Sequence, residues 1–176
     1  MKSFDLPAGD VTASMVVSPT GSAVSTTGTS RGLGNETDLA LLKWFRARSQ
    51  IVLTSGKTAE LENYRYPSST GLAILSRSQR TYDSLTEDRE KVLFLTGVDT
   101  YRQAIEELRN LGFQKVHCEF GPSGFIELVN EGKVDGFVSC VEASGIESFA
   151  QLHNLSVAKL HDVADDLVVG QLLGRG

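Results

Sequence analysis

Short apolar runs alternate along the chain with stretches of helical spacing. The first apolar run, residues 11–18, predicts a strand. Residues 20–34 are rich in Gly, Ser and Thr and too polar for a core, which predicts a turn or short hairpin with a loop. A helix capped by Asn35 is expected from there to Arg48. Its apolar stripe consists of Leu39, Leu42 and Phe45 at helical spacing, widened by Leu41 and Trp44.

The middle of the chain predicts shorter elements. Residues 51–53 and 71–76 are apolar runs typical of buried strands. Residues 58–64 between them predict a short helix or turn, which Pro67 ends. Residues 81–90 are polar and predict a loop.

The second half repeats a strand–helix order. Strands are predicted at 92–96, 115–119 and 134–141. Thr100 and Gln103 form a capping box for a helix that Gly112 ends, and a second helix runs to about Glu131. This order predicts parallel strands with helices on the faces of the sheet. Alternation at 156–160 and 167–173 predicts closing strands, antiparallel at the C-terminal edge.

Size and charge limit the classes of protein to which the chain can belong. The 176 residues, 40% hydrophobic and 22% charged, predict one globular domain spanning 1–176. A net charge of −5, with 17 scattered Lys and Arg, argues against nucleic acid as a partner. The first ten residues lack the apolar region of a signal peptide, and no run approaches the roughly 18 apolar residues of a membrane helix. A cytoplasmic protein without a membrane partner is the expectation.

The chain shows no metal motif. Its two cysteines, Cys118 and Cys140, lie in apolar runs and are expected to be buried and reduced. Three scattered histidines complete no zinc spacing, so no metal site is predicted. His117, His153 and His161 are interpreted as ordinary strand or loop residues without a chemical role.

Two short runs match known functional motifs only in part. Ser55-Gly56-Lys57-Thr58 is similar to the end of a phosphate-binding P-loop, but Ile51 stands where that motif needs a glycine. The run from Gly121 to Gly124 is similar to a serine nucleophile elbow, but the spacing is wrong. Both activities are therefore excluded.

The loop after the predicted strand 115–119 is the informative feature. A glycine there lets the backbone approach a ligand, and the next helix offers free N–H groups to a phosphate. Parallel sheets hold phosphates at this end of their strands. An ordinary strand-to-helix turn with proline near the start of the helix fits the residues equally well.

Several motifs in order resemble one family. The run Glu119-Phe120-Gly121-Pro122-Ser123 is similar to the E-G-G-P-[ST] signature of the riboflavin-biosynthesis reductases. Ser18 to Gly21, Phe45 to Thr58, Glu62 to Tyr64 and Glu131 to Gly136 match further motifs of that family. The chain thus resembles the reductase domain of the bacterial riboflavin-biosynthesis deaminase-reductase, in the dihydrofolate-reductase-like superfamily.

This resemblance implies a fold, a reaction and a site. The fold would be a three-layer α/β/α domain with a largely parallel mixed sheet and an antiparallel C-terminal edge. The reaction would be hydride transfer from NADPH to the ribosylamino Schiff base of a phosphorylated pyrimidine, in a homodimer. Ser30, Arg46 and Glu119 would bind the substrate. The implied NADPH contacts are Val16, Gly32, Thr58, Glu62, Phe120, Gly121, Pro122, Ser123 and Gly124; no catalytic side chain is implied.

The chain departs from the family pattern at defined positions. Thr20 and Lys57 replace a family aspartate and glycine, and Phe120 replaces the first glycine of the signature. The family's arginine ligand for the substrate phosphate has Ser69 in register, with Arg65 nearby. Two alternatives therefore stay open. One is a related NADPH reductase of another small substrate, such as a pterin or nitro compound, and the other is a non-catalytic binding protein of the same fold.

Overall fold

A single mixed sheet runs through the computed structural model, which describes residues 3–78 and 80–176. In that part of the chain the sheet has eight strands in the order β4-β3-β2-β5-β1-β6-β8-β7. β8 runs antiparallel to both of its neighbours, and the other pairs are parallel. The mixed, largely parallel sheet with an antiparallel C-terminal edge is therefore confirmed. The strands are β1 (Val11–Val16), β2 (Ile51–Ser55), β3 (Gly71–Leu75), β4 (Val92–Leu95), β5 (Val116–Glu119), β6 (Asp135–Cys140), β7 (Leu155–Ala164) and β8 (Leu167–Gly174).

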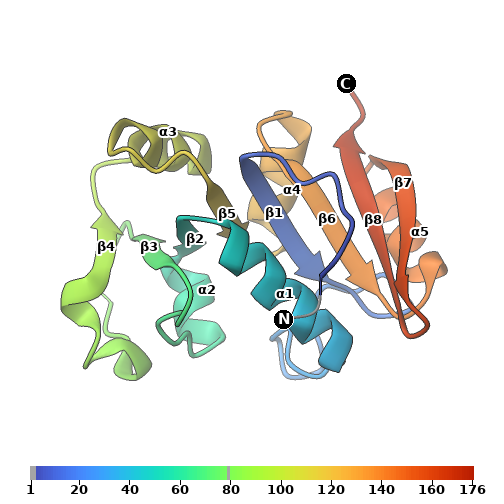
Figure 1. Ribbon diagram of the computed structural model, residues 1–176, viewed down its shortest axis with the longest axis horizontal. Coiled ribbons are helices and arrows are strands. Elements are labelled where there is room, and N and C mark those ends of the chain that lie inside the picture. Colours follow the sequence, from blue (N-terminus) through green and yellow to red (C-terminus); the bar gives the residue numbers. More distant parts are fainter. Residues whose placement is uncertain (1–2, 79) are drawn as a thin grey trace.

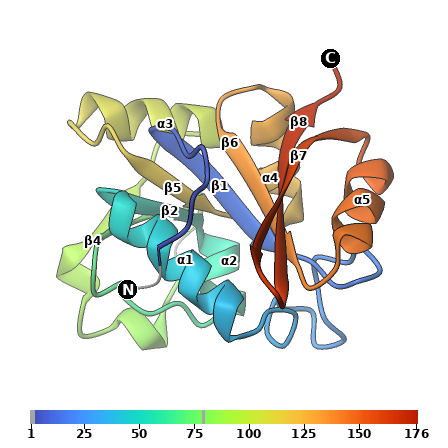
Figure 2. The same cartoon turned by 45° about the vertical axis from the view of Figure 1, so that its right-hand side comes forward.

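Helices cover both faces of the sheet and make three layers. α3, α4 and α5 pack with the larger apolar cluster on one face, and α1 and α2 pack on the other. In Figure 1, α1 lies in front of the sheet and α4 behind it, and Figure 2 shows the same layers turned by 45° about the vertical axis. No helix in the described residues is long and apolar enough to cross a membrane. The helices are α1 (Glu36–Arg48), α2 (Gly56–Leu61), α3 (Tyr101–Asn110), α4 (Pro122–Asn130) and α5 (Ala143–Leu152).

The predicted helix boundaries follow from their caps. The Asn35 side chain accepts a hydrogen bond from the backbone N–H of Asp38, which starts α1 where the sequence predicts. Thr100 and Gln103 form the complete capping box of α3. Gly112 follows α3 with φ of +98°, a conformation that glycine adopts without strain. The segment predicted as a loop, residues 81–90, contains the short 3-10 turn η1 (Asp83–Leu85) and the start of a second one, η2 (Arg89–Lys91).

Two sequence-based interpretations of helices need correction. The buried face of α1 consists of Leu41, Trp44 and Phe45, whereas Leu39 is 50% exposed. The cause is that Phe4 and Leu6, from the N-terminal segment, pack on this helix and set which side is buried. α5 is a helix that was not predicted from the sequence, because no side chain caps its start.

The two faces of the sheet differ in polarity. β-Strand side chains alternate between faces, and the side chains facing α3, α4 and α5 are apolar, including both cysteines, which are buried and unpaired as predicted. On the opposite face, polar side chains are buried in the central strands. These are Thr12, Thr54, His117, Glu119 and Ser139. A core does not need buried polar groups, so this face is where a functional site is expected.

Candidate functional site

A large cleft opens at the carboxyl ends of the central strands. It has a volume of about 1270 Å³. Val16 at the end of β1, Ser55 at the end of β2, Leu75 at the end of β3, Glu119 at the end of β5 and Ser139 on β6 all line it. β5 inserts between β2 and β1, so the strand order reverses at this place. Open α/β sheets bind ligands in such a crevice.

The start of α4 forms one wall of the cleft. Gly121 is the N-cap residue of α4, Pro122 follows it, and no side chain caps this end. A Cβ built on Gly121 would have Thr58 Oγ1, at 4.0 Å, as its nearest neighbour, so open space lies before this glycine. Thr58 is held by Ser55, whose hydroxyl caps α2. Free N–H groups at a helix start attract anions.

Phe120 leaves the cleft open. Its side chain is 6% exposed and packs on Tyr101 with the ring centroids 4.2 Å apart. The ring belongs to the apolar cluster under α3 and α4 and contributes only to the wall of the cleft. The substitution of a family glycine by Phe120 thus fills a gap in the core and does not close the site.

The cleft gathers most of the residues that the resemblance singled out. Gly124 is the exception and does not line it. A Cβ on Gly124 would lie 2.8 Å from Phe120 Cβ and 3.0 Å from the Tyr101 ring, so this glycine allows α4 to pack closely. The predicted residues that do line the cleft are Val16, Ser30, Gly32, Arg46, Thr58, Glu62, Glu119, Phe120, Gly121, Pro122 and Ser123.

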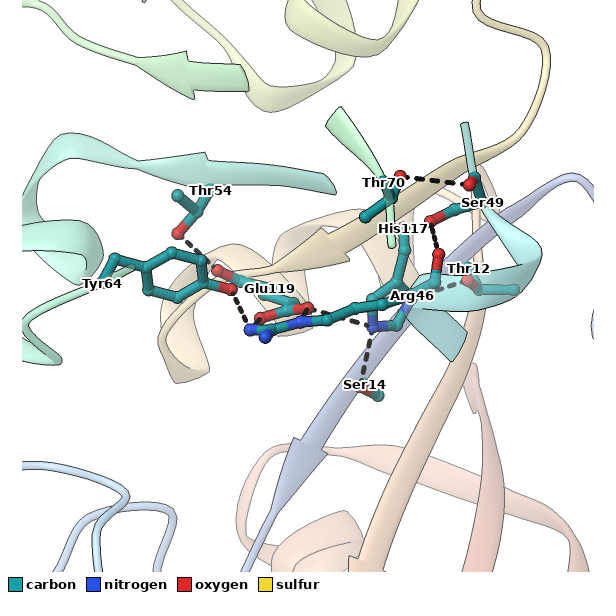
Figure 3. A network of polar contacts seen from close by, with 9 residues as sticks. All are labelled: Thr12, Ser14, Arg46, Ser49, Thr54, Tyr64, Thr70, His117 and Glu119. Carbon is teal, nitrogen blue, oxygen red and sulfur yellow. Dashed lines mark hydrogen bonds and ion pairs between the residues drawn. The ribbon is translucent and has the colours of Figure 1, made fainter. Parts of the chain in front are cut away.

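Two of the expected substrate ligands bind each other. The guanidinium of Arg46 donates to both carboxylate oxygens of Glu119, with Nε and Nη2 each 2.7 Å from their acceptors. Arg46 also donates to the hydroxyl of Tyr64 at 2.9 Å. Figure 3 shows Arg46 reaching across the sheet between these partners. The Glu119 carboxylate is therefore charge-compensated within the protein.

His117 lies beneath this ion pair and was missed as a polar centre of the site. The imidazole is fully buried, and its Nδ1 and Nε2 atoms lie 2.8 and 3.1 Å from the hydroxyls of Thr12 and Ser14. It stacks on Phe45 at 4.9 Å. Burial, helped by the charge of Arg46, lowers the pKa of His117 to about 3, so the ring is neutral. The sequence contains a signal for this cluster, because strand alternation in residues 116–119 and 11–14 places these side chains on one face of the sheet.

Glu62 fixes the loop that follows β1. Its carboxylate accepts the backbone N–H of Ser30 at 2.8 Å, and its backbone carbonyl accepts from Arg31 at 2.9 Å. The loop of residues 17–35 is thereby tied to the end of α2 across the cleft. Glu62, expected to contact the cofactor, uses its carboxylate to position Ser30.

The lining of the cleft is basic although the chain is acidic. Among the described residues, six basic and three acidic side chains line it, whereas the whole chain has a net charge of −5. Lys57, Arg77 and Arg80 lie near the carboxyl ends of β2 and β3, and Arg80 forms an ion pair with Glu60. A concave basic lining attracts phosphorylated ligands.

Asp38 is a second polar residue of the cleft that no sequence motif predicts. It lies in the first turn of α1 and lines the cleft, and the Ser139 hydroxyl donates to its Oδ1 at 2.5 Å. Burial raises the pKa of Asp38, and the Ser139 hydrogen bond offsets part of that rise. In the sequence Asp38 could only be interpreted as an ordinary acidic residue at the start of a helix.

The sheet order, the layers and the position of the cleft define a dihydrofolate-reductase-like fold, as the sequence resemblance predicted. Solved structures carry this conclusion, because no protein-family model and no curated protein matches the chain.

Solved structures of bacterial and yeast proteins share this fold. A pyrimidine reductase-like protein of Corynebacterium diphtheriae is similar over 94% of this chain and 92% of its own, with a TM-score of 0.66 and 17% identity. RibD of Acinetobacter baumannii has a TM-score of 0.70 at 16% identity; the likeness covers 96% of this chain and 59% of RibD. The riboflavin biosynthesis reductase Rib7 of Saccharomyces cerevisiae has a TM-score of 0.65 at 12% identity, over 97% and 93% of the two chains.

Proposed function

We propose that this protein is an NADPH-dependent reductase that transfers hydride to a carbon–nitrogen double bond of a small phosphorylated substrate. The substrate class we favour is a ribosylaminopyrimidine. A protein of Thermotoga maritima with a similar fold is a diaminohydroxyphosphoribosylaminopyrimidine deaminase/5-amino-6-(5-phosphoribosylamino)uracil reductase. The observation that carries the proposal is the open basic cleft at the switch point of the sheet, beside Gly121.

The residues of the cleft fit a dinucleotide phosphate. Gly121 and the uncapped start of α4 provide a backbone cradle that a side chain at position 121 would obstruct. Lys57 and Arg77 offer charges to a terminal phosphate. The bound cofactor would supply the hydride, and the protein would align it with the substrate and exclude water.

A related reductase of another small substrate is the second candidate. Arg46 and Glu119 bind each other, so a substrate that needs both groups must first open this pair. A substrate that uses the paired Arg46–Glu119 surface without breaking it fits the arrangement equally well. Turnover of the phosphoribosylaminouracil distinguishes the two candidates.

Ligand binding tests the proposal most directly. NADPH that binds only the folded protein should raise its melting temperature, by an amount that grows with concentration. Arg77→Gln and Lys57→Gln should each weaken NADPH binding about 10- to 100-fold, because a charge-assisted hydrogen bond contributes roughly 1.5–3 kcal/mol. NADH lacks the extra phosphate, so the same substitutions should weaken NADH binding much less.

Lys133→Gln is the matched control, because Lys133 is exposed after α4 and does not line the cleft. It should bind NADPH like the unmodified protein. An unchanged melting temperature at millimolar NADPH and NADH would contradict the proposal. NADPH binding gained only in Phe120→Gly would instead identify a non-catalytic member of the fold.

We further propose that residues 1–176 act as one reductase domain in the cytoplasm and form a homodimer. β7 is a ten-residue strand at the edge of the sheet, and Leu160 on it and Leu173 on β8 are 37% and 53% exposed. Edge strands with exposed apolar side chains favour association. Sedimentation equilibrium of the protein and of Leu160→Lys tests this, and a monomer at tens of micromolar protein contradicts it.

A further inference from the structure

The carboxyl group of Asp38 is held in a fixed place on the wall of the cleft. Its backbone N–H donates to the Asn35 side chain at 2.9 Å, and its Oδ1 accepts from Ser139 on β6. A Cβ on Gly34 would lie 2.3 Å from Asp38 Oδ2, so position 34 leaves room for this carboxyl only as glycine. Two elements and a loop therefore define one position for the acid.

The hydrogen bonds around Ser139 are compatible with a neutral acid. The Ser139 hydroxyl has one proton and two acceptors in reach, Asp38 Oδ1 at 2.5 Å and the Met15 carbonyl at 3.3 Å. When Asp38 is protonated, its own O–H can donate to Ser139, and the Ser139 proton then turns to Met15. Each polar group keeps a partner in both protonation states.

The surroundings of Asp38 contain no compensating cation. Within residues 3–78 and 80–176, no ion pair involves Asp38. The facing groups on β1 and β6 are the uncharged Ser14, Met15 and Ser139. Of the charged groups nearby, Arg46 on α1 is bound to Glu119 of β5, and Arg31 of the loop after β1 donates to Glu62, the residue after α2. Glu36 on α1 is exposed, and Asp166, between β7 and β8, accepts from Asn35 and Thr37.

Asp38 lies beside the carboxyl end of β1. Val16 lies opposite Ser139 in the register of β1 and β6. The carboxyl bonded to Ser139 thus lies beside the carboxyl end of β1, where the proposed function would place the nicotinamide half of NADPH. The other acids of the cleft are engaged, since Glu119 is bound by Arg46 on both oxygens and Glu62 accepts from Ser30.

From this geometry we infer that Asp38 supplies the proton of the reduction, an inference that rests on the proposed function. A carbon–nitrogen double bond needs one hydride and one proton. As the carbon receives the hydride, the π electron pair moves to the nitrogen, which takes the proton from Asp38 Oδ. Asp38 becomes a carboxylate bound by Ser139, and water in the open cleft returns the proton.

The experiment compares the unmodified protein with Asp38→Asn, which keeps an oxygen for Ser139 but has no acidic proton. Carbon-13 NMR of aspartate carboxyls should show one group titrating above the ordinary range, and only Asp38→Asn should remove that signal. The rate at which the phosphoribosylaminouracil is reduced with NADPH should fall about 10²- to 10⁴-fold in Asp38→Asn, which is the usual contribution of a general acid. NADPH affinity should change less than twofold.

Two further variants separate catalysis from structure. Glu36→Gln, an exposed acid in the same first turn of α1, should leave titration and turnover unchanged. Ser139→Ala should keep the proton but shift the pH profile of turnover, because it removes the hydrogen bond that stabilises the carboxylate. An Asp38 that is ionised throughout, or turnover unchanged in Asp38→Asn, overturns the inference. Absence of turnover in the unmodified protein overturns the proposed function itself, and the NMR titration reports on the acid in either case.

Discussion

His117 is a buried base that carries no charge in the folded protein. Both ring nitrogens are hydrogen-bonded to hydroxyls, and its contact of 3.8 Å with Glu119 would be an ion pair only if the ring were protonated. Burial lowers its pKa to about 3, whereas an unfolded histidine has a pKa near 6.5. The unfolded chain therefore takes up a proton in this interval and the folded chain does not.

This difference predicts a pH-dependent stability. As pH falls from about 7 toward 3, the unfolded state gains the proton, so the free energy of unfolding should decrease by up to about 1.4 kcal/mol per pH unit. His117→Gln removes the titrating group and should flatten that slope. Urea unfolding between pH 4.5 and 7.5 measures it, and Thr12→Val, which keeps the imidazole, should retain it. Parallel stability curves for His117→Gln and the unmodified protein would contradict the assignment.

At the scale of elements, sequence pattern succeeded where local chemistry determines structure. The α1 and α3 starts follow from Asn35 and from the Thr100–Gln103 box, which act within one turn. α5 also carried a pattern, since its buried Ile146, Phe149 and Ala150 are spaced by three and four residues. Without a capping side chain that pattern was too short to be recognised.

Distant contacts could not be predicted in this way. The N-terminal segment packs on α1 and thereby determines which face of this helix is buried. No local pattern in the sequence predicts that contact. The Arg46–Glu119 pair joins residues 73 positions apart. The resemblance placed both residues at the site, but their mutual binding, like the Asp38–Ser139 contact, depends on the three-dimensional arrangement of α1, β5 and β6.

The contact of α4 with β6 depends on the absence of a side chain at Gly136. A Cβ there would lie 2.4 Å from Val129 Cγ2 and 3.2 Å from the Phe125 ring. Val129 is β-branched and stiff, so Gly136→Ala should lower the free energy of unfolding by about 1–3 kcal/mol. Chemical denaturation measures this loss.

Val129→Ala supplies the matched test of that contact. It removes the clashing methyl groups, so the double variant should lose less stability than the two single losses added together. Simple additivity of Gly136→Ala and Val129→Ala would show that the close approach has another cause.

At the scale of the whole molecule, the two cysteines report on global unfolding. Cys118 on β5 and Cys140 on β6 lie in the two strands that flank β1, on the α3–α5 face, and have no exposed surface. Burial raises the pKa of the Cys118 thiol well above its usual range, and the thiolate is the reactive form. Opening of the sheet must therefore precede chemical modification.

We expect both thiols to be unreactive toward a disulfide reagent until the sheet unfolds. The labelling rate should follow urea concentration with the slope of global unfolding, because the central strands open only with the whole domain. Ser144→Cys, at the exposed start of α5, should label at once without denaturant. Rapid labelling of Cys118 that is insensitive to urea would show local opening of β5.

The place of β1 in the middle of the sheet also has a consequence for biosynthesis. β1 pairs only with β5 and β6, and Val11 meets Val116 in the first of these pairs. At synthesis rates of about 5–20 residues per second, roughly 5–20 s pass before the ribosome delivers that partner. During this time an apolar strand has emerged without its neighbours. The nascent chain thus has a long window in which a chaperone, or a wrong partner, can reach β1 first.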